Sequence, residues 1–130
     1  AYKEKIELPK DASKIMFRSG GGHIHIGSKD EEVVSFMQAN VDSIVRLLDM
    51  TVGVLVTSLE NKDDIKQRRK YYGRAGEYRL PKYGIEYRVP SNIWLQDTTL
   101  IKPIISLTET IVISFIKGIN SEAKDFINQE

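Results

Sequence analysis

The chain contains no cysteine among its 130 residues. Disulfide bonds and thiolate metal sites are therefore excluded, which suits a reducing compartment. An excess of one charge is also missing, because 19 lysines and arginines face 18 acidic residues, giving a formal net charge of +1. This balance gives no overall indication of a nucleic-acid or membrane partner. We therefore expect a cytoplasmic protein.

Uninterrupted apolar runs are missing as well. The polar N-terminus has no signal-peptide pattern, and the apolar C-terminal segment is interrupted by Lys102, Glu109 and Lys117. We therefore expect no membrane-spanning segment. The chain is long enough to bury one core, so residues 1–130 are predicted to form a single domain.

A glycine-rich stretch followed by alternating residues is the most informative part of the sequence. Gly20 to Gly22 precede an alternation of histidine and isoleucine. Glycines without a Cβ atom let the backbone turn sharply or approach bulky groups. On a strand, His23 and His25 share one face, while Ile24 and Ile26 share the other. One face suits a core and the other suits a site.

A second alternation lies about sixty residues later, over residues 84–90. There Glu86 and Arg88 share one face, and the other face carries Ile85, Tyr87 and Val89. Two solvent-exposed histidines at a strand end are the simplest interpretation of His23 and His25 alone. The second polar pair favours another interpretation, in which two strands together line a site for a metal ion and an anion.

Amphipathic helices are predicted on both sides of this second strand. Ser28 is a good N-cap for a helix of about eight turns, or about 45 Å, that ends at Leu59. Gly53 in this helix indicates a kink or a close contact. Residues 61–70 indicate a short polar helix, and residues 6–17 indicate extended segments.

A second long helix is predicted near the C-terminus. Asp97 or Thr98 can cap it, and Gly118 and Asn120 are expected to end it before a short helix over residues 121–127. The element order predicts an α+β fold. In this fold, two long helices pack on one face of a mainly antiparallel sheet.

The polar residues of the two strands suggest a chemistry. Neutral imidazole and carboxylate groups bind divalent cations, and guanidinium groups bind phosphate or carboxylate. Without cysteine or a Ser-His-Asp set, the combination suits phosphoryl transfer at a metal. The glycines do not form a Walker loop, because the Gly-Lys-Ser/Thr sequence does not follow Gly22.

Three motifs in this order resemble a known family. Gly21–Gly27, Tyr72–Arg79 and Ile85–Pro90 resemble motifs of the carboxylate–amine ligases (amidoligases) of phages and bacteria. These belong to the glutamine synthetase and glutamate–cysteine ligase superfamily. The likeness runs from about residue 18 to residue 94, so it implies a glutamine synthetase-like fold for this part of the chain.

The resemblance implies a metal site and a nucleotide site. His23 and Glu86 would bind one divalent cation, Mg²⁺ or Mn²⁺, and His25 would contact a phosphate of ATP. In the implied reaction, ATP phosphorylates a carboxylate, and an amine attacks the acyl phosphate to form an amide. The partners would be a small-molecule or peptide carboxylate and an amine, in the host cytoplasm if the protein is phage-encoded.

The resemblance also implies roles for three arginines. Arg88 would hold the substrate carboxylate or the phosphoryl group. Arg79 and Arg74 would be further phosphate-binding residues, with Arg79 also close to the reacting groups. Metal ions and arginines together offset the charge that moves onto the bridging oxygen.

The chain departs from the family pattern in its length. The superfamily's catalytic domain is roughly twice as long, and its first half supplies acidic metal ligands on early strands. Only Glu4 and Glu7 precede the histidine strand here, and their spacing does not match. The chain therefore resembles a C-terminal half. It is a fragment, or a second chain supplies the missing half, or activity has been lost.

Two alternatives come from other classes of protein. Residues 66–88 interleave basic side chains with tyrosines, which could stack on bases and pair with phosphates in a nucleic-acid-binding module. The near-neutral net charge argues against that alternative, and it leaves the histidine pair unexplained. The other alternative is a structural remnant that keeps the ligase fold without catalysis.

Overall fold

The computed structural model describes residues 21–71 and 73–128, and its side chains as far as Ile119. Its three strands are β1 (Ile24–Gly27), β2 (Tyr78–Arg79) and β3 (Gly84–Tyr87). They form an antiparallel sheet in the order β1-β3-β2. The expected extended segments at residues 6–17 lie outside the described residues.

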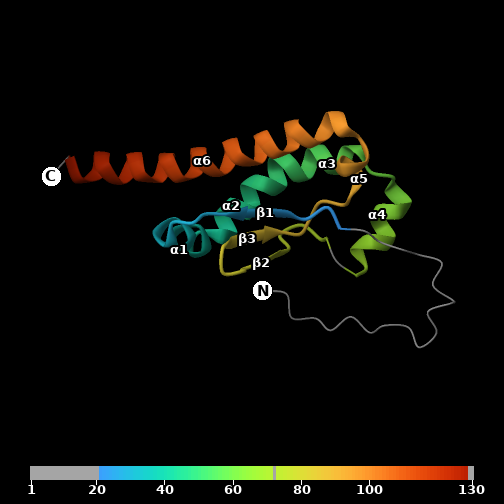
Figure 1. Cartoon of the computed structure of the whole chain (residues 1–130), viewed down its shortest axis with the longest axis horizontal. Helices are drawn as coiled ribbons and strands as arrows, with labels where there is room; N and C mark the ends of the chain where they lie inside the picture. Colours follow the sequence, from blue (N-terminus) through green and yellow to red (C-terminus); the bar gives the residue numbers. More distant parts are fainter. Residues whose placement is uncertain (1–20, 72, 129–130) are drawn as a thin grey trace.

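Helices cover the apolar face of this sheet (Figure 1). In chain order, the helices are α1 (Glu31–Ala39), α2 (Val41–Leu48), the π-helix η2 (Asp49–Gly53), α3 (Val54–Leu59), α4 (Lys62–Arg69), α5 (Ile93–Gln96) and α6 (Thr98–Asn128), of which α4 lies beside the sheet (Figure 1) and adds no residue to the core. The α+β class and the antiparallel sheet are thus confirmed.

Alternation along the strands determines the core. In the register of β1 and β3, Ile24 lies opposite Tyr87 and Ile26 opposite Ile85. These apolar side chains pack against residues of α2, η2 and α6, namely Ile44, Val45, Leu48, Val52, Ile104 and Val112. Burial of this face is the main favourable term that holds the helices on the sheet.

The predicted first long helix is wrong as a single element, because the structure divides it. Asp30 is its N-cap and accepts a hydrogen bond from the Glu32 N–H, whereas Ser28 accepts one from the Asp30 N–H. Asn40 ends α1, and its side-chain amide donates to the Phe36 carbonyl. A Cβ atom on Gly53 would lie 2.8 Å from the Tyr87 hydroxyl oxygen, so glycine permits close contact between η2 and the sheet.

The polar helix at residues 61–70 is confirmed as α4, with Asn61 as its N-cap. Asp97 precedes α6 and accepts a hydrogen bond from the Thr99 N–H. The predicted helix end near Gly118 is wrong, because α6 continues to Asn128. One glycine inside a helix costs only about 1 kcal/mol, which does not stop so long an element.

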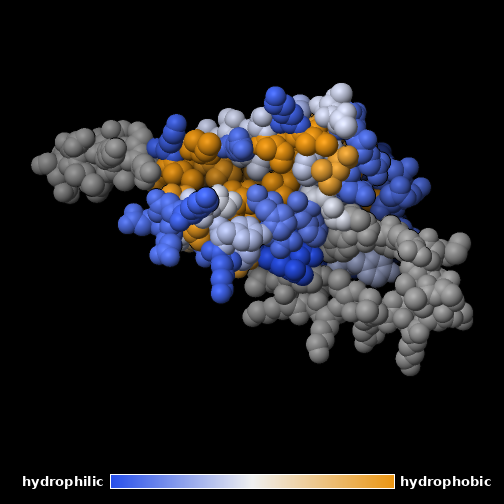
Figure 2. All heavy atoms as spheres, in the orientation of Figure 1, coloured by the Kyte–Doolittle hydropathy of each residue, from blue (hydrophilic) through white to orange (hydrophobic). Residues whose placement is uncertain are grey.

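Helix α6 is long and carries much apolar surface. Over Thr98–Ile119 its length and its mean hydropathy of 1.6 are sufficient to cross a membrane, and 17% of that window is buried. The expectation that no segment would meet this test is therefore wrong. The charged residues are too widely spaced to prevent it, although the core helix of a globular protein can also pass. Figure 2 shows the hydrophobic surface over α6 and the elements beside it.

Candidate functional site

The polar face of the sheet brings together three of the predicted site residues. His23 Nδ1 lies 3.1 Å from Glu86 Oε1, and Arg88 Nη1 donates to the same oxygen at 3.4 Å. The side chains of Glu86 and Arg88 are 13% and 9% exposed. Adjacent antiparallel strands thus place a ring nitrogen, a carboxylate and a guanidinium side by side.

The surroundings of His23 favour its neutral form. Burial lowers the pKa of His23, and the Arg88 charge lowers it further, against the opposing effect of the Glu86 hydrogen bond and charge. Neutral imidazole is the form that binds a metal ion. Because a carboxylate only accepts, the bond between these side chains places the His23 proton on Nδ1.

His25 and Arg79 extend the same face in a row across three strands. His25 lies opposite Glu86 on one side, and Arg79 lies opposite Glu86 on the other. Both side chains are exposed, and His25 Nδ1 forms a hydrogen bond with the Tyr83 hydroxyl. Arg74 lies at another position, where its Nε donates to the Arg69 carbonyl at the end of α4.

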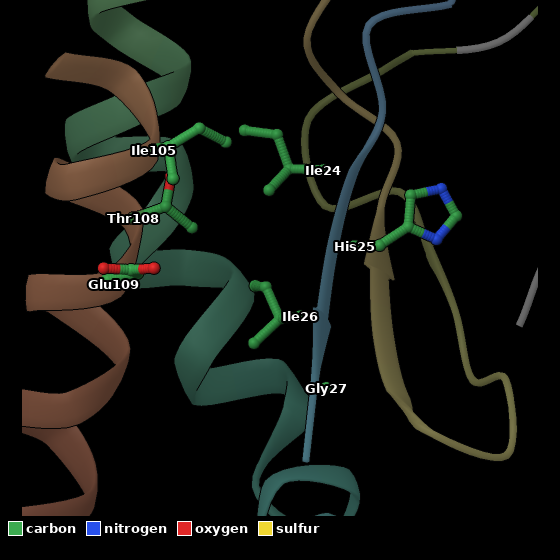
Figure 3. Close-up of a pocket in the computed structure, with 7 residues that line it drawn as sticks. All are labelled: Ile24, His25, Ile26, Gly27, Ile105, Thr108 and Glu109. Carbon is green, nitrogen blue, oxygen red and sulfur yellow. The ribbon is translucent and has the colours of Figure 1, made fainter. Parts of the chain in front are cut away.

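The opposite side of β1 faces a separate pocket with both apolar and polar lining residues. Figure 3 shows Ile24 and Ile26 pointing toward the helices, while the imidazole of His25 points away from them. The pocket has a volume of about 180 Å³, and α6 contributes Ile105, Thr108 and Glu109 to its lining. Period-two alternation therefore separates the polar face from this pocket.

The described residues supply only part of a metal site. His23 and Glu86 are of the types that Mg²⁺ or Mn²⁺ can use, but the His23 Nδ1 that faces Glu86 carries a proton in this hydrogen bond, so both can bind one ion only after this bond is rearranged. Over residues 21–71 and 73–128, however, no group of three or more His, Cys, Asp or Glu side chains is placed to hold a metal ion. A complete centre therefore requires further ligands from outside this set.

Arg68 supports the site and was not identified from the sequence. This residue of α4 is 4% exposed, and it donates to the Val89 carbonyl at 2.7 Å and the Pro90 carbonyl at 2.8 Å. A third bond, at 3.3 Å, reaches the Arg88 carbonyl. Arg68 therefore holds the backbone that carries Arg88. No local pattern distinguishes it from the basic residues around it.

The glycine stretch is held against the same segment. The Trp94 indole N–H donates to the Gly22 carbonyl at 3.1 Å, and the Gly22 N–H donates to the Pro90 carbonyl at 3.3 Å. These bonds join the backbone before His23 to the backbone after Arg88. They keep the two halves of the polar face adjacent.

The nucleic-acid alternative is not favoured by the placement of its tyrosines. Tyr87 is fully buried and donates to Asp49 Oδ1 at 2.6 Å, so it cannot stack on a base. Arg68 is buried as well, and Tyr72 lies outside the described residues. The basic and tyrosine side chains of residues 66–88 are thus divided between the core and the surface.

Comparisons with known proteins identify a ligase family. The family model described as "Phage phiEco32-like COOH.NH2 ligase-type 2" matches residues 4–127. The "Female-specific lacrimal gland protein" of Mesocricetus auratus is 30% identical over 83 residues. That match covers 64% of this chain and 46% of the relative, so it spans about half the relative's length. No solved structure matches this chain.

Proposed function

The chain belongs to the phage phiEco32-like COOH.NH2 ligase-type 2 family, and from this premise we propose that it takes part in ATP-dependent joining of a carboxylate to an amine. The observation that carries the proposal is the joined set of His23, Glu86 and Arg88, with contacts of 3.1 and 3.4 Å at one carboxylate oxygen. The set combines cation-binding and anion-binding groups on one surface. Phosphoryl transfer requires both.

The proposed reaction has two steps. A carboxylate oxygen of the acid attacks the γ-phosphorus of ATP, the bond to the β–γ bridging oxygen breaks, and ADP leaves. The amine nitrogen then attacks the acyl carbon, its proton passes to solvent or a base, and phosphate leaves. In this proposal, Arg88 binds the carboxylate or phosphoryl oxygens, while His25 and Arg79 contact the phosphates. Arg74 is a further phosphate-binding candidate from its loop.

We further propose that this chain is the C-terminal half of a glutamine synthetase-like catalytic domain, acting in the cytoplasm. Bound Mg²⁺ or Mn²⁺ would neutralise phosphate charge, and His23 and Glu86 are the residues that would hold it. The partial ligand set supports a second segment, or a second chain, that supplies acidic ligands. The polar face carries several basic or imidazole side chains, which favours an acidic partner: His23, His25, Arg79 and Arg88.

The geometry of β1 suggests where such a segment would pair. The Ser28 N–H donates to the Tyr83 carbonyl at 3.1 Å, so alternate residues of β1 hydrogen-bond to β3. The main-chain groups of His25 and Gly27 therefore point to the other edge, where none of the described residues forms a pairing strand. A strand added at that edge would place every second side chain on the polar face, beside His25.

Binding of ATP and Mg²⁺ tests the proposal by calorimetry. We expect weak binding to this chain, with a loss of about tenfold or more in Glu86→Gln, because a charged contact is removed. Arg88→Lys should lose less, since lysine keeps the charge but not the forked geometry. The matched controls, Glu109→Gln on α6 and Arg46→Lys on α2, change exposed residues and should bind as the unchanged chain does.

Turnover separates the remaining outcomes. Phosphate release and amide product are measured with a panel of acids and amines, with and without an added acidic N-terminal half. Turnover only with that half supports the incomplete-site proposal, and robust turnover by this chain alone contradicts it. Binding of single-stranded RNA with a steep salt dependence, in place of ATP binding, would favour the nucleic-acid alternative.

A further inference from the structure

Tyr83 is attached to the histidine strand at two points. Its carbonyl accepts the Ser28 N–H at 3.1 Å, and its hydroxyl forms a hydrogen bond with His25 Nδ1. The two ring centroids lie 5.8 Å apart, with the ring planes tilted by 38°. The Tyr83 side chain therefore lies beside the His25 imidazole, and the Tyr83 backbone is bonded to Ser28, the residue that follows β1.

Gly27 makes this placement possible. A Cβ atom at residue 27 would lie 2.9 Å from the Tyr83 carbonyl oxygen and 3.0 Å from its ring carbon Cδ2. Either contact is shorter than van der Waals packing allows, so a larger residue would displace Tyr83. The final glycine of the Gly-Gly-His-Ile-His-Ile-Gly motif thus has a direct role in seating the tyrosine against His25.

We propose that the Tyr83 hydroxyl donates to His25 Nδ1, which makes Tyr83 a positioning residue that fixes the tautomer of His25. When the Tyr83 hydroxyl donates to Nδ1, the neutral imidazole carries its proton on Nε2. An Nε2–H group is a hydrogen-bond donor, and its natural partner is an anionic oxygen such as that of a phosphate. The phosphate as ligand rests on the proposed function, whereas the proposed tautomer rests on the contact between the Tyr83 hydroxyl and His25 Nδ1.

The two histidines of the motif are thereby given opposite tautomers. His23 directs Nδ1 at the Glu86 carboxylate, which only accepts, so its proton lies on Nδ1. His25 directs Nδ1 at the Tyr83 hydroxyl, and with that hydroxyl donating, as proposed, the proton of His25 lies on Nε2. Glu86 on β3 and Tyr83 before β3 thus give the two histidines different roles. His23 is a candidate metal ligand, and His25 is a candidate hydrogen-bond donor to phosphate.

Long-range ¹H–¹⁵N NMR of the imidazoles tests this directly, at a pH where both rings are neutral. We expect Nε2–H for His25 and Nδ1–H for His23. Tyr83→Phe should move His25 toward the tautomer mixture of free imidazole and leave His23 unchanged. The matched control is Tyr71→Phe, because Tyr71 is 45% exposed and Tyr83 is 42% exposed.

Calorimetric titration with inorganic triphosphate supplies the second readout. Tyr83→Phe should weaken binding by about two- to tenfold, as expected for loss of one oriented hydrogen bond. In a His25→Gln background the same change should have no further effect. An unchanged His25 tautomer in Tyr83→Phe overturns the proposal. The expected tautomer shift without triphosphate binding by any variant supports the positioning role and contradicts the proposed ATP site.

Discussion

Replacing Arg68 by methionine should cost much of the stability of this chain. Methionine keeps an unbranched apolar stem but removes the donors to three carbonyls, at 2.7, 2.8 and 3.3 Å. A hydrogen bond from a charged group contributes about 1.5–3 kcal/mol, and buried carbonyls left without donors add a desolvation cost. The contributions of two short bonds and one longer bond from the same side chain do not simply add. We therefore expect the free energy of unfolding to fall by about 3–5 kcal/mol.

Urea denaturation measures this loss. The single tryptophan, Trp94, is 4% exposed and reports the transition by fluorescence, while circular dichroism follows the helices. With an m-value of about 1.5 kcal/mol/M, a loss of about 3 kcal/mol lowers the midpoint by about 2 M. Total stability of a small domain is about 5–15 kcal/mol, so the variant should remain folded without urea or nearly so.

Two further variants show whether the loss comes from the Arg68 hydrogen bonds. Lys66→Met changes an exposed residue of the same helix and should leave the midpoint unchanged within error. Arg68→Lys keeps the charge but cannot span the carbonyls with a fork, so its midpoint should lie between the others. If Arg68→Met unfolds at the same urea concentration as the unchanged chain with the same m-value, the three carbonyl contacts do not hold the strand and the reasoning is refuted.

Three other predictions follow from contacts in the core and at the site. Gly73→Ala should lower the free energy of unfolding, measured in urea, by about 1–3 kcal/mol, because residue 73 has φ +79° and its Cβ would lie 2.0 Å from Arg68 Nη1. A stability equal to that of the unchanged chain would contradict this prediction. Burial lowers the pKa of His23, so its contribution to stability is complete above about pH 6.5 and is lost as the pH falls. The urea midpoints at pH 8 and pH 5 should therefore differ less in His23→Gln than in the unchanged chain. Burial, aided by the bond to Asp49, raises the pKa of Tyr87, so stability falls as the pH rises above about 10; Tyr87→Phe should lose about 1–3 kcal/mol at pH 7 and show a smaller alkaline decline.

The composition of the site's polar face could be predicted because strand alternation is local. His23, His25, Glu86 and Arg88 needed only a period of two and two strand assignments to be placed on common faces. The pairing of β1 with β3 in the observed register then set Glu86 opposite His25 and beside His23. Their roles toward a metal ion and ATP remain predictions.

The course of the helices was less predictable, because apolar spacing does not reveal where a helix bends. The stripe from Val34 to Leu59 continues past Asn40, yet α1 ends there and a π-helix follows α2. The π-helix passes the fully buried Tyr87, whose hydroxyl bonds Asp49. This hydrogen bond joins residues 38 positions apart, and no helical pattern encodes such a contact.

The sequence by itself determined which face of each strand is polar, and only the tertiary structure decided what each polar group does. Arg68 and its exposed neighbour Lys66 look alike in the sequence, but Arg68 is buried beneath the carbonyls of Val89 and Pro90. His25 obtains its hydroxyl partner from Tyr83, 58 residues away. The burial and the hydrogen-bond partners of a side chain depend on segments that meet only in the folded chain. Contacts between residues so distant in sequence leave no local sequence pattern, so the sequence alone does not reveal them.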